Sequence, residues 1–237
     1  MGEGGVREGQ TDRFGDTFLH FGEILFNGMA AGREEMLKDW PQLLGILHNA
    51  RRACVASMGS ILSRPDREFQ IEDLQQKLRR ATIHGAVIQG IHAIEYCISI
   101  GAYAQAAALV RQEIEAVEGL RGIRQGLQND GHTPRLKALK HIGAYYGQLS
   151  GLAHLSDHSL LTHVVSEKVG NIDHSLNAEF ARCLFGLHVL ALVGVTLDIA
   201  ELRPYSESEL FSEDEKWWLD AACGVLVEEG LMQVLEV

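Results

Sequence analysis

Four side chains that can carry acid–base or hydroxyl chemistry recur every fourth residue within positions 144–159. They are Tyr146, Ser150, His154 and His158. In a helix, this spacing places them on one polar ridge beside an apolar stripe. A histidine beside a hydroxyl can act as a general base or acid in phosphodiester cleavage, because its pKa lies near neutrality. The structural alternative is that Ser150 bonds back to a backbone carbonyl and His154 fills a packing edge.

The same stretch also allows a metal-binding interpretation. His154, His158 and His163, with Asp157 between them, are ligand types whose spacing lets two or three converge from a helix and the turn after it. The Glu-x-x-His motif of di-iron bundles is absent. No cofactor is expected from the motifs, and a divalent metal at these four residues stays an alternative. His84, His92 and His188 lie in apolar stretches and are expected to be hydrogen-bonded core residues.

The elements that must position these side chains all have helical periodicity. Apolar residues recur at three- and four-residue steps, and no segment alternates convincingly as a strand does. The pattern predicts a first helix near residues 14–25, a second opened by Pro41, and later helices over residues 71–100, 102–126, 135–158, 174–199 and 213–230.

Turn and cap residues support these boundaries. Gly101 suits a left-handed C-terminal cap, so the helices on either side of it should form a central αα-hairpin. Ser212 followed by Glu215 matches a capping box, which predicts a helix start near Glu213. We therefore expect an all-α, single-domain bundle of about seven to eight helices over residues 13–237, after a flexible tail at residues 1–12.

The hairpin and the polar ridge together carry a family resemblance. Residues 93–156 resemble helical bacterial proteins of the HEPN superfamily, including abortive-infection-like proteins, in which an A-x-x-L-x-R-x-x-x-E helix packs beside one ending in Y-x-x-L-S-x-x-x-H. The matching residues are Ala106, Ala107, Ala108, Leu109, Arg111, Glu113, Glu115, Tyr146, Leu149, Ser150 and His154.

The resemblance implies a ribonuclease or nucleotide-modifying activity in catalytic members, which use an arginine four to six residues before the histidine. Here the residues preceding His154 include Gly147, Gln148 and Leu149, so the cation that would stabilise the phosphate is missing locally. Arg111 from the neighbouring helix can substitute only if the two helices bring it to His154. The absence of an arginine shortly before His154 favours a family member without the usual arginine–histidine site. The candidate catalytic residues are His154, Ser150, Tyr146 and Arg111.

Charge and composition bear on partners and location. The net charge is −11, and residues 201–237, with ten acidic and two basic side chains, contribute −8 of it. Nucleic-acid binding is thus not supported by overall charge, although a local basic groove is compatible with it. The 4 cysteines have no paired spacing, which favours reduced thiols in a cytoplasmic protein. The apolar run at residues 184–197 is too short to span a bilayer and predicts a central buried helix.

The acidic C-terminal helix suggests a second class of function. Trp217 and Trp218 point about 100° apart on a helix, so one can be buried while the other is exposed. An exposed tryptophan is typical of an oligomer or partner surface. The leading expectation is thus a HEPN-like protein of stress or phage defence. The alternatives are a homo-oligomeric interaction module, such as a homodimer, and a histidine-rich metal-binding bundle.

Overall fold

The computed structural model describes residues 40–64, 74–127, 143–157 and 177–232, together with positions 34, 38 and 159. All regular structure within these ranges is helical, which confirms the predicted all-α bundle. The predicted tail at residues 1–12 and the predicted first helix lie outside the described residues. The helices are α2 (Ile46–Ser63), α3 (Leu74–Ser99), α4 (Tyr103–Arg124), α5 (Gly143–Ala153), α7 (Ala178–Leu202) and α8 (Glu213–Glu228).

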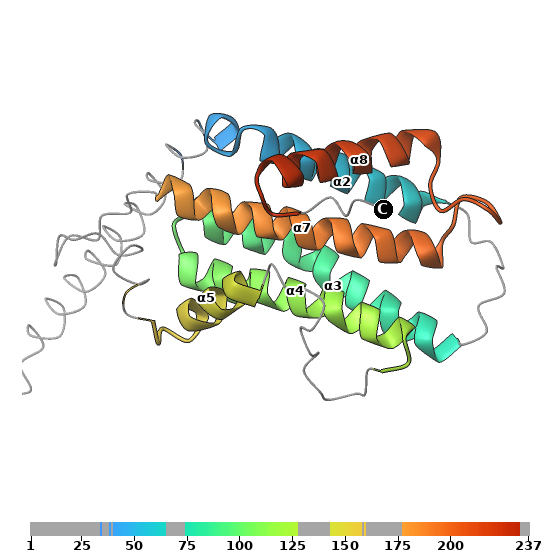
Figure 1. Ribbon diagram of the computed structural model, residues 1–237, viewed down its shortest axis with the longest axis horizontal. Coiled ribbons are helices and arrows are strands. Elements are labelled where there is room, and N and C mark those ends of the chain that lie inside the picture. Colours follow the sequence, from blue (N-terminus) through green and yellow to red (C-terminus); the bar gives the residue numbers. More distant parts are fainter. Residues whose placement is uncertain are drawn as a thin grey trace, which may run out of the picture.

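Helix α7 is the centre of the bundle. It contacts α2, α3, α4 and α8, and in Figure 1 it lies between the α2–α8 pair on one side and the α3–α4 pair on the other. Among the described helices it alone is long and apolar enough to cross a membrane, so the prediction that its apolar run is too short to do so was wrong. However, 78% of its most apolar window is buried inside the molecule. The predicted central buried helix is therefore confirmed, and it begins later than expected, after the N-cap Asn177.

The predicted αα-hairpin is formed by α3 and α4. Gly101 has a φ of +70°, a conformation that glycine adopts without a steric penalty. Its N–H donates to the carbonyl of Ile98 at 3.1 Å, and the next N–H donates to Cys97 at 2.9 Å. This C-terminal cap turns the chain sharply, so that α4 returns along α3.

Helix α8 begins with the predicted capping box. The Ser212 side chain accepts from the Glu215 N–H, and the Glu215 carboxylate accepts from the Ser212 N–H at 2.8 Å. The same carboxylate accepts from Ser60 at 2.7 Å and pairs with Arg64. Ser60 belongs to α2, and Arg64 is the residue that follows its last turn. One acidic side chain thus starts α8 and joins it to α2.

Helix α5 lies on the outer side of α4. Its residues Leu149 and Leu152 are buried in the core, while the opposite face is exposed. In Figure 1, α5 lies at the far edge of the bundle from α8, with α7 between them. The predicted start of this helix at residue 135 lies outside the described residues, and its end at Ala153 comes before the predicted residue 158.

Candidate functional site

The candidate catalytic residues meet where α5 packs against α4. Tyr146 and Ser150 project from α5, His154 is the residue after its last turn, and Arg111 projects from α4. Because Leu149 and Leu152 anchor the inner face of α5, the polar ridge lies along the edge of the contact. Tyr146 and Ser150 are half-buried there, and His154 is exposed.

The Arg111 guanidinium joins these side chains. Its Nη1 donates to His154 Nε2 at 3.0 Å and to Ser150 Oγ at 3.4 Å. Its Nε lies 3.1 Å from the Tyr146 hydroxyl, and the guanidinium carbon lies 5.4 Å from the centre of the Tyr146 ring. The four residues predicted from the sequence thus form one connected cluster, which we call the Arg111 cluster.

Glu115 completes the Arg111 cluster and was not nominated as a site residue from the sequence. Its Oε1 accepts from Arg111 Nε at 3.0 Å and from the Tyr146 hydroxyl. The sequence feature that could have identified Glu115 is its spacing of four residues from Arg111, which places both side chains on one face of the helix. Glu113, which the family pattern offers equally well, points the other way into the core.

The electrostatics of the Arg111 cluster fix its resting state. The hydrogen bond to Tyr146, together with that to Glu115, raises the pKa of Arg111 and keeps it charged. Partial burial and the neighbouring carboxylate of Glu115 raise the pKa of Tyr146, so its hydroxyl stays protonated and donates. Because a guanidinium can only donate, His154 Nε2 accepts and carries the lone pair.

This arrangement has the parts of an anion-binding acid–base site. A fixed cation can stabilise charge on an oxyanion, and an imidazole nitrogen with a lone pair can accept a proton. Both groups lie at an exposed edge of the molecule, where a ligand can approach. The cation that is missing from residues 147–149 is therefore supplied by α4.

The metal-binding alternative involves residues that are only partly described. His158 and His163 lie outside the described residues. Asp157 accepts from the N–H and hydroxyl of Ser159, at 3.1 and 2.6 Å. His154 Nε2 faces the Arg111 guanidinium. Within the described part of the chain, no group of three or more histidine, cysteine, aspartate or glutamate side chains is arranged to hold a metal ion.

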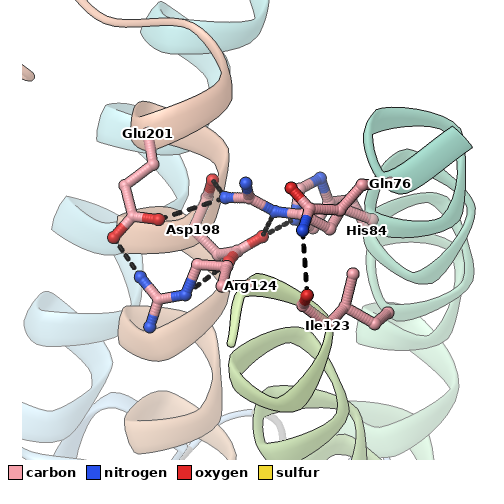
Figure 2. A network of polar contacts seen from close by, with 7 residues as sticks. Gln76, His84, Ile123, Arg124, Asp198 and Glu201 are labelled. Carbon is pink, nitrogen blue, oxygen red and sulfur yellow. Dashed lines mark hydrogen bonds and ion pairs between the residues drawn. The ribbon is translucent and has the colours of Figure 1, made fainter. Parts of the chain in front are cut away.

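A second polar cluster lies where α3, α4 and α7 meet. Figure 2 shows His84, Arg124, Asp198 and Glu201 in this cluster. Asp198 Oδ2 accepts from Arg80 Nε at 3.0 Å and from His84 Nε2 at 2.7 Å. Arg80, His84 and Asp198 are buried and hold one another inside the bundle, whereas Arg124 and Glu201 pair at its partly exposed edge. This arrangement indicates a structural role.

A third polar cluster lies deeper in the core and joins four helices. His188 of α7 is fully buried, and its Nδ1 lies 2.7 Å from Glu113 Oε2 of α4. Its Nε2 lies 3.8 Å from Glu95 of α3, which pairs with Arg51 of α2. Like His84, His188 is a hydrogen-bonded core histidine as expected from its apolar surroundings.

His92 differs from these two histidines. It was expected in the core for the same reason, but its side chain is exposed. The prediction was wrong because an apolar stretch in a half-buried helix still has one face toward solvent.

Comparison of this chain with protein-family models, with curated proteins and with solved structures finds no match.

Proposed function

We propose that this is a HEPN-like helical protein of stress or phage defence that cleaves RNA phosphodiesters at the Arg111 cluster. The observation that carries the proposal is the 3.0 Å separation of Arg111 Nη1 and His154 Nε2. An arginine and a histidine within hydrogen-bonding distance supply the cation and the proton acceptor that such cleavage needs. The two residues come from neighbouring helices rather than from one helix.

The proposed reaction uses the 2′-hydroxyl of the substrate as the nucleophile. A phosphate oxygen that binds Arg111 Nη1 takes the N–H now donated to His154, which frees His154 Nε2. That nitrogen accepts the 2′-hydroxyl proton as the 2′-oxygen bonds to phosphorus and the bond from phosphorus to the 5′-oxygen breaks. Water protonates the leaving 5′-oxygen, and the products are a 2′,3′-cyclic phosphate and a 5′-hydroxyl end.

The distribution of charge is compatible with an anionic substrate at this edge. Residues 201–237 contribute −8 of the net −11. Helix α8, which begins with Glu213, Asp214 and Glu215, lies on the opposite side of α7 from α5 (Figure 1). The repulsion that RNA meets near α8 is therefore weak at the Arg111 cluster, because salt screens charges beyond about 8–10 Å.

A cleavage assay with end-labelled RNA tests the proposal. The wild type should convert RNA to products with cyclic phosphate ends, and His154→Ala and Arg111→Ala should each lower the rate by about 100-fold or more. The matched control is His92→Ala, which removes an exposed histidine from α3 and should leave the rate unchanged. Intact RNA with the wild type, or equal cleavage by wild type and His154→Ala, contradicts the proposal.

A second function is favoured by one observation on α8. Trp217 is 69% exposed while Trp218 is half-buried, an arrangement typical of a contact surface for a second copy or another protein. A homo-oligomeric interaction module predicts that wild-type protein is a dimer by light scattering and that Trp217→Ala is a monomer. A strictly monomeric wild type argues against this second function.

A further inference from the structure

Four of the described helices end with the same hydrogen-bond pattern. In each, the residue after the cap donates to the carbonyl three positions back, and the following N–H donates to the carbonyl five positions back. In three of them, α3, α4 and α8, the residue in the left-handed conformation is a glycine: Gly101, Gly126 and Gly230, with φ of 66 to 70°. In α5 it is Leu155, with φ of 52°.

Leu155 is therefore the exception among these four helix ends. In the described part of the chain it is the one residue other than glycine with a positive φ. A side chain there brings Cβ close to the following carbonyl oxygen, which glycine avoids. Burial does not offset this strain, because Leu155 is 57% exposed. Strained residues of this kind tend to persist where a function needs them.

The position of Leu155 beside the Arg111 cluster indicates what function its strained conformation serves. It directly follows His154, which Arg111 contacts. Within the proposed function, on which this inference rests, we propose that the Leu155 side chain packs against the base of the nucleotide whose phosphate Arg111 binds. The exposed apolar side chain suits the flat, apolar face of an unpaired base, so the substrate class is single-stranded RNA.

A binding experiment separates this contact from cleavage. The probe is a fluorescent single-stranded 2′-O-methyl oligonucleotide, which lacks the nucleophilic hydroxyl and stays intact, and fluorescence anisotropy measures its affinity. Leu155→Gly should bind about tenfold more weakly than the wild type, because the apolar contact is lost, yet melt at a higher temperature, because the strain is relieved. Leu155→Ala should lose the same affinity without the rise in melting temperature.

An abasic oligonucleotide of the same length is the matched probe. Wild type and Leu155→Gly should bind it equally, since it offers phosphates but no base, whereas Arg111→Ala should weaken binding of both probes. Equal binding of the base-containing probe by wild type and Leu155→Gly, with Arg111→Ala still defective, overturns the base contact alone. No binding of either probe by wild type, together with no cleavage of RNA, overturns the proposed function and the base contact with it.

Discussion

At the scale of single residues, Asp198 holds together the second polar cluster. It is buried, and Arg80 and His84 both donate to its Oδ2. Burial alone raises the pKa of Asp198, but the hydrogen bonds from His84 and Arg80 outweigh it and lower the pKa, so the carboxylate stays ionised. Asp198→Ala should destabilise the protein by roughly 3–5 kcal/mol in urea unfolding, because Arg80 and His84 lose the buried carboxylate that they share, and only the partly exposed Glu201 still pairs with Arg80.

Glu201→Ala is the matched control for Asp198→Ala. Glu201 also pairs with Arg80 and with Arg124, but its side chain is 33% exposed, so water can replace it. Its removal should cost less than about 1 kcal/mol. Equal losses in the two variants argue against burial as the cause of the difference.

His188 should make the stability of the fold depend on pH. Complete burial lowers the pKa of His188, but the carboxylates of Glu113 and Glu95 outweigh burial and raise it from 6.5 to about 9. A group whose pKa is higher in the folded state stabilises the fold fully below its unfolded pKa, here 6.5, and loses that effect as the pH rises through 9. The free energy of unfolding should therefore fall by about 3 kcal/mol between pH 6 and 9.

Urea unfolding of wild type and His188→Gln at several pH values measures this effect. The variant lacks the titrating group, so its stability should be lower at pH 6 and change little up to pH 9. A wild type that is equally stable at pH 6 and pH 9 speaks against a protonated His188 in the core.

At the scale of helices, the packing of α4 on α7 depends on Gly194. A Cβ at this position would lie 2.8 Å from Cγ1 of Val117, a β-branched side chain with little freedom to move. Gly194→Ala should thus destabilise the protein by roughly 1–3 kcal/mol despite the better helix propensity of alanine. Gly90→Ala in α3, where nothing lies within 4 Å of the added Cβ, should stabilise it by up to about 1 kcal/mol in thermal unfolding.

The helices and some of their ends could be predicted from the sequence because they depend on local signals. The end of α5 at Ala153 differs from the predicted residue 158, because Leu155, and not a glycine, adopts the left-handed conformation that ends it. Gly101 marked the hairpin, and Ser212 with Glu215 marked the start of α8. The pairing of Arg111 with His154 depends instead on how α5 is positioned along α4, which the packing of Leu149 and Leu152 sets. Periodicity gives the faces of two helices but not their relative position, so the choice between Glu113 and Glu115 could not be made before the structure.

At the scale of the whole molecule, the net charge of −11 limits how RNA can bind. An acidic protein gains little from displaced counterions except where it contacts phosphates directly. With one or two phosphates at the Arg111 cluster, the logarithm of the association constant should fall with the logarithm of salt concentration with a slope between about −0.7 and −1.4. Anisotropy titrations at several salt concentrations measure this slope, and a slope steeper than about −4 indicates a larger basic surface.

The central position of α7 also sets an order of events during synthesis. The α3–α4 hairpin can form as soon as Arg124 has left the ribosome, but the core-facing carboxylate of Glu113 then lacks the histidine with which it pairs in the folded protein. His188 emerges 64 residues later, since ribosomes add residues one at a time from the N-terminus. Until α7 has been made, the hairpin therefore has the acidic group of Glu113 on an apolar face, and α7 supplies both the apolar cover and the histidine that pairs with this carboxylate.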